Sequence, residues 1–368
     1  MEKKIMLKRI IAAVMSVCLI FIVCSLLNSC GCSMGGGSTA DVHVFYYTYS
    51  DPYISSVRSA LDEKLDEAGV SYQDYDSNNS QTTQTEQVQT AITKGAKLIV
   101  VNIVTTGSDD AATGIVSLAK DRGIPVIFFN REVSDTVVNS YDKCIFVGTD
   151  AAEAGYLQGD MIGDYLTENF DSVDLNGDGE ISYVMFMGEK GNNEAIYRTQ
   201  YSVENADKKL EAEGYAPLSF YDSSNKDKYL LDRDGKWSAQ AANEYMTTLL
   251  TSYNKASDNM VELIICNNDN MAEGAITALT AAGYNTGVEG DITVPVFGVD
   301  ATDAAKSLIK AGRMTGTVRQ DAEGMADVLT VAVDSGLEGK ELTEGLGDYT
   351  IDKDAAKVRI NYSAYFGE

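Results

Sequence analysis

From residue 42 onward, short runs of β-branched and aromatic residues alternate with longer segments in which apolar residues recur every three or four positions. The short runs predict β-strands. The longer segments predict amphipathic helices, as in residues 51–69, where Ile54, Val57, Leu61 and Leu65 share one helical face. Because strands and helices alternate, we expect right-handed βαβ units and parallel sheets. The strands are expected at residues 42–48, 70–75, 98–104, 125–129, 145–147, 183–187, 217–221, 261–266 and 294–299.

The N-terminal segment has the profile of an export signal: basic residues precede an 18-residue apolar run from Ile10 to Leu27. The sequence Leu-Asn-Ser-Cys follows and resembles the lipobox of bacterial lipoproteins, in which Cys30 would take the lipid. An uncleaved transmembrane anchor is the alternative, because such a run can just span a bilayer. Both interpretations place the rest of the chain outside the cytoplasm.

These features divide the chain into a signal peptide at 1–29, a lipidated flexible tether at 30–40 and a folded region from 41 onward. The tether is expected to be flexible because residues 31–39 are rich in glycine and serine. The remaining length suits two domains of ordinary size.

Composition excludes several classes of function. The formal net charge of −26 makes the chain a poor ligand for nucleic acids and anionic lipids. His43 is the only histidine, which excludes the usual histidine zinc sites and a Ser-His-Asp triad. The sequence has no Walker A loop, nucleophile elbow or dinucleotide-binding glycine motif, so we do not expect an enzyme. Cys144 and Cys266 lie in apolar strands and are expected to be buried free thiols.

Polar residues follow four of the predicted strands: Asp51, Asn102, Asn268 and Asp300. Each of them alone could be only the N-cap of the next helix. Parallel sheets, however, bind ligands beyond the carboxyl ends of their strands, so four such residues in separate βα units indicate a shared crevice.

Two further residues suggest what the crevice binds. Arg198 and the four polar residues are planar hydrogen-bonding groups that can serve adjacent hydroxyls. Trp237, the only tryptophan, lies at the start of a helix among polar neighbours and could present its ring to the C–H face of a pyranose, although a core tryptophan is the alternative. The inferred ligand is a sugar.

Several long motifs then fall in the order and spacing of a known family: "SYDKCIFVGTD", "DLNGDG", "IICNNDNMAEGAI", "VPVFGVDA" and "GTVRQDA". From about Val42 to Tyr362 the chain resembles the periplasmic galactose/glucose-binding proteins of the type I substrate-binding fold. The resemblance implies an α/β protein with two Rossmann-like parallel-sheet lobes, joined by a three-crossing hinge that closes around the sugar.

The resemblance also implies lobe boundaries. The N-terminal lobe would comprise residues 41–129 plus 321–350, and the C-terminal lobe 130–320 plus 351–368. The three crossings would lie near 129–131, 320–321 and 349–351.

Ten sugar-binding residues are implied by the resemblance: Asp51, Tyr53, Asn102, Asn192, Glu194, Arg198, Trp237, Asn268, Asp300 and Gln320. Four depart from the family, which has phenylalanine for Tyr53, histidine for Asn192, aspartate for Glu194 and asparagine for Gln320. Glu194 is one methylene longer and lies four residues before Arg198, so this carboxylate and guanidinium must be placed differently. Arg198 is the one fixed cation of the set, which favours neutral hexoses; the choice between glucose and galactose stays open.

The segment from Asp174 to Met185 begins like an EF-hand calcium loop but lacks the glutamate at its twelfth position. The resemblance supplies that carboxylate from Glu262. The implied structural Ca²⁺ ligands are Asp174, Asn176, Asp178, the backbone carbonyl of Glu180, Ser182 and Glu262, with a bridging water expected at the short Ser182. A solvated turn of Asp, Asn and Gly residues is the alternative.

We therefore expect an extracytoplasmic lipoprotein, monomeric and held at the outer face of the cytoplasmic membrane only by its lipid. It would capture a neutral hexose of the galactose/glucose type and deliver it to an ABC permease, with a chemoreceptor as a further partner. The alternative is a lipoprotein that presents a sugar or another signal to a histidine kinase. A repressor of the same fold would need a basic helix-turn-helix at its N-terminus, and a sugar-cleaving enzyme would have to use Asp51 and Asp300 as its carboxylate pair.

Overall fold

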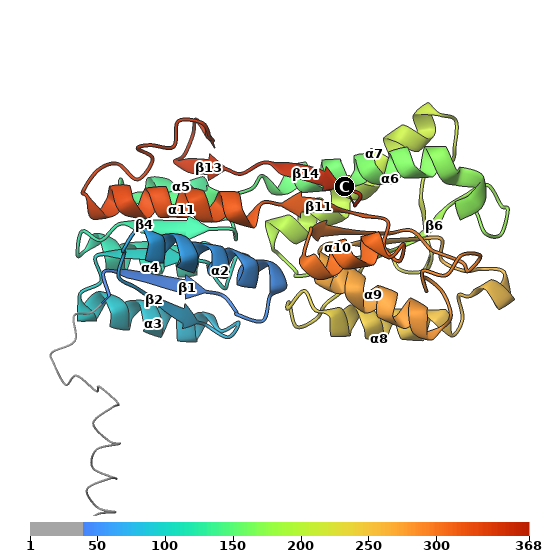
Figure 1. Ribbon diagram of the computed structural model, residues 1–368, viewed down its shortest axis with the longest axis horizontal. Helices are drawn as coiled ribbons and strands as arrows, with labels where there is room; N and C mark the ends of the chain where they lie inside the picture. The colour runs from blue at the N-terminus through green and yellow to red at the C-terminus, as the bar shows by residue number, and fades with distance from the viewer. Residues whose placement is uncertain (1–39, 368) are drawn as a thin grey trace, which may run out of the picture. The chain divides into compact units, whose positions relative to one another are not determined.

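The computed structural model describes residues 40–367, and these residues form two α/β lobes, each built on a seven-stranded sheet (Figure 1). The fold class implied by the resemblance is therefore confirmed. The predicted signal peptide, the tether and Cys30 lie outside the described residues. Within the described part of the chain, the helices are all too short or too polar to cross a membrane.

The first lobe contains a sheet in the order β12-β13-β5-β4-β3-β1-β2, parallel except where β12 pairs antiparallel with β13. Its strands are β1 (Val42–Tyr46), β2 (Tyr72–Asp76), β3 (Leu98–Val101), β4 (Val126–Phe129), β5 (Cys144–Gly148), β12 (Thr350–Ile351) and β13 (Lys357–Arg359). Its helices are α2 (Pro52–Glu67), α3 (Gln81–Lys94), α4 (Asp110–Lys120), α5 (Asp135–Asn139) and α11 (Ala322–Leu337).

The second lobe contains a sheet in the order β14-β11-β10-β9-β6-β7, with β8 also paired to β6 and only β14 antiparallel. Its strands are β6 (Ser182–Met187), β7 (Ser219–Phe220), β8 (Leu230–Leu231), β9 (Leu263–Cys266), β10 (Val296–Asp300), β11 (Gly316–Gln320) and β14 (Tyr362–Tyr365). Its helices are α6 (Ala151–Val173), α7 (Asn193–Ala212), α8 (Ala239–Leu250), α9 (Asp269–Ala281) and α10 (Asp303–Lys310), with a short 3₁₀ helix at Lys255–Ser257.

Strand pairing corrects the first predicted boundary between the lobes. β5 pairs in parallel with β4 and with β13, so residues 130–148 belong to the first lobe. The chain therefore first crosses after Gly148 and not at 129–131. Both sheets contain continuously apolar, buried strands like β5, so the sequence of β5 does not indicate which sheet it joins.

The third crossing is corrected in the same way. β12 and β13 still belong to the first sheet, whereas β14 pairs with β11 in the second, so the chain crosses between Arg359 and Tyr362 and not at 349–351. The remaining passage runs from β11 directly into α11, at Gln320–Asp321.

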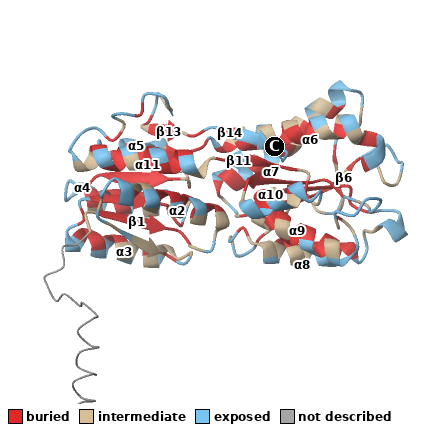
Figure 2. Cartoon of the chain, viewed as in Figure 1, coloured by how far each residue is buried: buried red, intermediate tan, exposed pale blue. Residues whose placement is uncertain are grey.

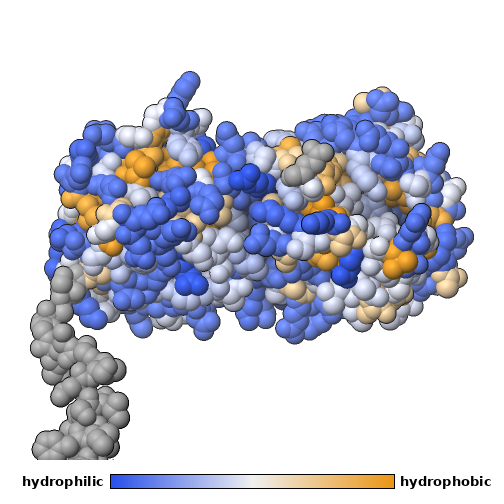
Figure 3. Space-filling view, viewed as in Figure 1, coloured by the Kyte–Doolittle hydropathy of each residue, from blue (hydrophilic) through white to orange (hydrophobic). Residues whose placement is uncertain are grey.

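Both faces of each sheet are buried under helices, and the strands form the buried centre of each lobe (Figure 2). This burial explains why β3, β4 and β9 are continuously apolar and do not alternate. Among residues 40–367, Cys144 in β5 and Cys266 in β9 are buried free thiols, as predicted. The outer surface is different: Figure 3 shows polar side chains over most of the visible face and apolar ones only in small patches.

Close packing of α6 against α7 fixes the helix that carries part of the site. Gly155, Gly159 and Gly163 recur at every fourth position of α6, and a Cβ at Gly155 would lie 2.5 Å from the carbonyl oxygen of Tyr197. Only glycine lets the two helices approach this closely.

A half-buried pair of carboxyl groups, Asp62 and Asp74, lies in the first lobe, outside the cleft. Asp62 on α2 is within hydrogen-bonding reach of Asp74 on β2, and the nearby guanidinium of Arg58 partly opposes the rise in the pKa of Asp74. Burial, with the nearby charge of Asp62, raises the pKa of Asp74 to about 8. The folded protein therefore holds a proton that the unfolded chain loses near pH 4.

The raised pKa of Asp74 predicts a stability that falls as pH rises. The proton's contribution is fully present below about pH 4 and is lost as pH approaches about 8, so the free energy of unfolding should fall by about 2 kcal/mol or more over this window. Asp74→Asn should flatten the curve, measured by urea denaturation from about pH 5 to about pH 9. Asp121→Asn, at an exposed position of the same lobe, is the control, and equal pH slopes in wild type and Asp74→Asn would contradict the prediction.

Candidate functional site

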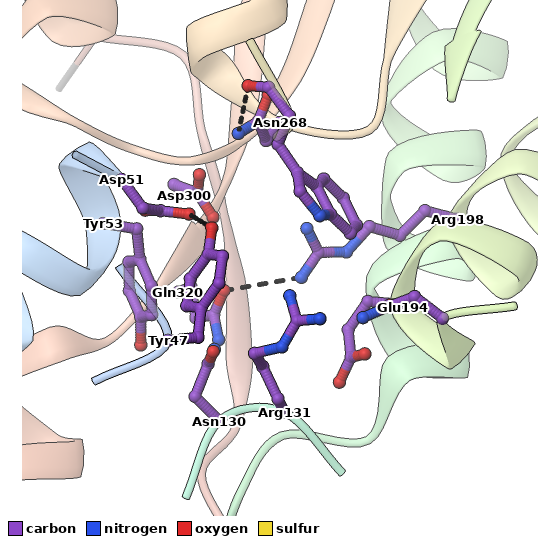
Figure 4. Close-up of a pocket in the computed structure, with 12 residues that line it drawn as sticks. Tyr47, Asp51, Tyr53, Asn130, Arg131, Glu194, Arg198, Asn268, Asp300 and Gln320 are labelled. Atoms are coloured by element: carbon purple, nitrogen blue, oxygen red, sulfur yellow. Dashed lines mark hydrogen bonds between the residues drawn. The ribbon is translucent and has the colours of Figure 1, made fainter. Parts of the chain in front are cut away.

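The carboxyl ends of strands from both sheets meet at a cavity of about 370 Å³, its opening to solvent included (Figure 4). Nine of the ten predicted sugar-binding residues line it, so residues far apart in the sequence are brought to one place. The lining residues are Tyr47, Asp51, Tyr53, Asn130, Arg131, Asn192, Glu194, Arg198, Trp237, Asn268, Asp300 and Gln320.

The first-lobe wall is held by the segment after β1. The Tyr47 hydroxyl donates to Oδ2 of Asp51 at 2.6 Å, while Oδ1 of Asp51 accepts from the backbone N–H of Ile54 at 3.0 Å. Asp51 is therefore both the N-cap of α2 and a cavity residue. Tyr53, in the first turn of the same helix, is buried, and its hydroxyl lies 3.8 Å from the Met325 sulfur.

Asn102 is the predicted residue that does not line the cavity. It is fully buried behind the wall, where its Oδ1 accepts from the backbone N–H of Tyr47 at 3.3 Å. Its Nδ2 donates to the Phe129 carbonyl and to Oδ1 of Asn130, both at 3.1 Å. In this structure Asn102 ties the end of β1 to the end of β4 and so positions Tyr47 and Asn130.

Sequence reasoning missed three lining residues: Tyr47, Asn130 and Arg131. Arg131 is a second buried cation beside the cavity, so Arg198 is not the one fixed cation there. The rule that selected the polar residues after other strands would have found Asn130 and Arg131, because they directly follow β4.

Arg131 is held almost entirely by the first lobe. Its Nε donates to the carbonyl of Ile103 at 2.7 Å, and its Nη2 donates to that of Val104 at 2.8 Å. Its guanidinium also lies over the Tyr47 ring, 4.4 Å from the ring centroid.

The second-lobe wall is formed by the start of α7. Asn192 is its N-cap, and Glu194 and Arg198 lie on its buried face. Arg198 donates from Nη1 to the carbonyl of Asn267 at 2.9 Å and from Nη2 to the Tyr362 hydroxyl at 2.9 Å and to Oε1 of Gln320 at 3.4 Å. The guanidinium is thus committed to groups other than Glu194.

Among residues 40–367, the Glu194 side chain has no hydrogen-bonding partner. Both of its carboxylate oxygens are buried without a hydrogen bond from this part of the chain, as are Nε of Arg198 and Nε2 of Gln320. Burial raises the pKa of Glu194, and the nearby Arg198 only partly opposes this effect. Burial raises the pKa of Asp300 in the same way, again opposed by Arg198.

Three lining residues have unfavourable backbone conformations. The φ angles of Asn130 and Trp237 are 58° and 54°, and that of Asp300 is 126°, followed by 57° at Ala301. Such conformations cost on the order of 1–3 kcal/mol each in residues other than glycine and persist only where the surrounding packing imposes them. They aim these side chains into the cavity at the expense of stability.

The Trp237 ring lies flat against the chain beyond β6. A Cβ at Gly188 would lie 2.2 Å from Cδ2 of the indole, so this position must be glycine for the ring to pack there. The indole N–H donates to Oε2 of Glu189 at 3.3 Å. Asn268, the N-cap of α9, donates to the Trp237 carbonyl at 3.4 Å, which holds the tryptophan backbone beside the cavity.

The predicted calcium loop lies at the end of α6, in the second lobe. Asp174 accepts backbone N–H groups of Gly177, Asp178 and Gly179 at 2.7–3.2 Å. The nearly fully buried Glu262 accepts from the backbone N–H of Leu175 at 2.8 Å.

Ser182 completes this arrangement. Its backbone N–H and its hydroxyl both donate to Oε2 of Glu262 at 2.9 Å, so strand β9 does bring Glu262 to the loop. Carboxylate and amide oxygens suit Ca²⁺. Within residues 40–367, however, three or more Asp, Glu, His or Cys side chains are nowhere gathered as a metal-binding group.

Comparison with known proteins identifies the family. Residues 42–341 match a family model described as a periplasmic binding protein domain. The chain is 34% identical over 305 residues to the D-galactose/methyl-galactoside binding periplasmic protein MglB of Haemophilus influenzae, covering 83% of each chain. It is 29% identical over 279 residues to a putative rhizopine-binding protein of Rhizobium meliloti, covering 75% of this chain and 77% of the relative.

Solved structures agree on the fold. An ABC transporter solute-binding protein from Bacillus halodurans with bound myo-inositol has a TM-score of 0.65 at 25% identity, covering 90% of this chain and 96% of that one. A solute-binding protein from Clostridium phytofermentans with bound β-D-glucose has a TM-score of 0.70 at 21% identity, covering 89% and 94%. With two lobes, a cleft between them and a family match over most of its length, the chain belongs to the periplasmic binding proteins, a family of binding proteins and not of enzymes.

Proposed function

We propose that this protein captures a neutral hexose of the D-galactose/D-glucose type between its lobes and delivers it to an ABC permease. The observation that carries the proposal is a set of buried polar atoms in the cavity that find no hydrogen-bonding partner within the described residues: both oxygens of Glu194, Nε of Arg198 and Nε2 of Gln320. Each such group costs about 1–3 kcal/mol while unpaired, so a ligand that satisfies them gains affinity.

A sugar can both donate hydrogen bonds to the unpaired atoms of the cavity and accept hydrogen bonds from them. Glu194 needs donors, whereas Arg198 and Gln320 need acceptors, and a hydroxyl group is both. Adjacent ring hydroxyls can serve neighbouring groups at once, while the indole face of Trp237 suits the C–H face of a pyranose. The galactoside-binding relative and the related structure with bound myo-inositol support this class of ligand.

Charge favours a neutral ligand. Of the two arginines that line the cavity, Arg131 forms a 2.7 Å ion pair with Glu189, and Arg198 lies close to Glu194 and Asp300. The cavity lining also contains three acidic residues, Asp51, Glu194 and Asp300. Their charge would repel an acidic sugar. The changes at Asn192 and Glu194 would adjust the preference among hexoses.

Transport is the role that the relatives support, because the related solved structures are binding components of ABC transporters. Presentation of the bound sugar to a chemoreceptor or a histidine kinase would use the same closed form. We therefore propose transport as the main role and sensing as a second use of the same site.

Hexose binding predicts a signal from one residue. Because Trp237 is the only tryptophan and lines the cavity, titration with D-glucose or D-galactose should give a saturable change in fluorescence. Asp300→Ala should weaken binding roughly 10- to 100-fold, because it leaves sugar donors unpaired. Asp303→Ala, on α10 and exposed to solvent, is the control and should bind normally. Calorimetry that shows no heat with either hexose, or with other aldohexoses and pentoses, would disprove the proposed ligand class.

We also propose a structural Ca²⁺ at the loop after α6. Asp174, Asn176, Asp178, the Glu180 carbonyl, Ser182 and Glu262 would hold it. What supports it is the approach of Glu262 to the loop through Leu175 and Ser182, together with burial, which raises the pKa of Glu262 and disfavours its bare charge.

Calcium binding predicts a metal-dependent stability. At about 100 times its dissociation constant, Ca²⁺ should stabilise the folded protein by roughly 2.7 kcal/mol, so a chelator should lower the melting temperature. Glu262→Gln should remove this response, while Glu244→Gln, at an exposed site on α8, should keep it. Identical melting temperatures with calcium and with chelator would indicate the solvated turn instead.

We propose, from the motif that ends at Cys30, that lipid anchors the mature protein outside the cytoplasm. Cys30→Ser should block lipid attachment, so the protein should lose the added lipid mass in mass spectrometry and change its mobility on a gel. Cys32→Ser, two residues away, is the matched control and should remain anchored. A native protein with an unmodified Cys30 and an intact Met1 would instead support the uncleaved transmembrane anchor.

A further inference from the structure

The two lobes touch directly at one rim of the cleft. Nη2 of Arg131, in the first lobe, donates to Oε2 of Glu189, in the second, at 2.7 Å. Nδ2 of Asn192 donates across the cleft to the Thr106 hydroxyl at 3.3 Å. Beside them a Cβ at Gly191 would lie 3.6 Å from the Cα of Gly107. This rim is therefore closed by contacts within the protein itself.

Glu189 is the centre of these contacts although it does not line the cavity. Its Oε2 accepts from three donors in three segments: Arg131 at 2.7 Å, the Trp237 indole at 3.3 Å and Nδ2 of Asn192 at 3.4 Å. All three donors line the cavity. One carboxylate oxygen thus joins a cation of the first lobe to the aromatic ring and the amide of the second.

The ion pair depends on closure. Arg131 is fixed to its own lobe by the carbonyls of Ile103 and Val104, so it reaches Glu189 only when the lobes come together. The contacts of Glu189 with Trp237 and Asn192 lie within the second lobe and can persist when the lobes separate. The side chains of Arg131 and Glu189 are only 5% and 19% exposed, so salt screens this pair weakly.

Resting on the proposed sugar-binding function, we propose that Glu189 is a positioning and specificity residue with two effects. Its carboxylate links lobe closure to the orientation of the Trp237 ring, because the oxygen that pairs with Arg131 also holds the indole N–H. It also neutralises Arg131, which would otherwise offer a buried cation to an anionic ligand. Glu189 therefore favours the closed form and disfavours sugar acids.

The closure effect is tested on the ligand-free protein with Glu189→Gln, which keeps the side chain's shape and one acceptor oxygen but removes the charge. Without the ion pair, the lobes should separate more often, so the radius of gyration from small-angle scattering should increase. Acrylamide should also quench Trp237 more efficiently. Glu204→Gln, exposed on α7, is the matched control and should behave like wild type. If scattering and quenching are the same in Glu189→Gln and wild type, the closure effect is wrong.

The specificity effect is tested by calorimetry with D-galactose, D-glucose and their uronic acids. Glu189→Gln should bind the hexose about tenfold more weakly and release it faster, while its affinity for the uronic acid relative to the hexose should rise about tenfold or more. Glu189→Asp, which keeps the charge, should restore the wild-type preference. An unchanged ratio in Glu189→Gln would overturn this part. If wild type binds none of these sugars, the proposed function fails, and the ligand-free measurements still decide the role of Glu189 in closure.

Discussion

The structure depends on one constraint, that strands lying side by side in parallel must be connected by crossover segments that pack on the faces of the sheet. Once helices cover both faces of both sheets, the remaining place for polar side chains near the core is at the strand ends. The carboxyl ends of the two sheets meet, and the polar residues that follow six different strands form a single cavity.

The cavity lowers the stability of the folded protein but holds its side chains in position for a ligand. Positive φ angles at Asn130, Trp237 and Asp300 hold side chains where a relaxed backbone would not place them. Both oxygens of Glu194, Nε of Arg198 and Nε2 of Gln320 are buried without hydrogen-bonding partners among the described residues, so the ligand-free site carries a desolvation cost that the hydroxyls of the proposed ligand would relieve. The glycine contacts between α6 and α7 hold the helix that carries Glu194 and Arg198.

The replacement of aspartate by Glu194 shows how one methylene changes a site without removing it. The extra methylene predicted that this carboxylate and the Arg198 guanidinium are placed differently from the family's pair; here Arg198 bonds to Asn267, Tyr362 and Gln320. Glu194 is then available to the ligand alone. Arg131 shows the opposite case, a cation that lines the cavity yet is neutralised from the other lobe by Glu189, so the two arginines serve different purposes.

The sequence by itself determined the alternation of strands and helices, because the period of apolar residues and the polarity of strand ends are local properties. Through its motifs it also determined the family and nine of the ten predicted cavity residues. It could not determine which sheet each strand joins. The apolar pattern of β5 fits either lobe, and only its pairing with β4 assigns it to the first. β13 then pairs with β5 and β12 with β13, which moved two of the three crossings. It likewise could not show that Asn102 lies behind the wall while Tyr47, Asn130 and Arg131 line it. Which side chain faces a cavity depends on contacts between residues such as Arg131 and Glu189, 58 positions apart, and only the tertiary structure brings such residues together.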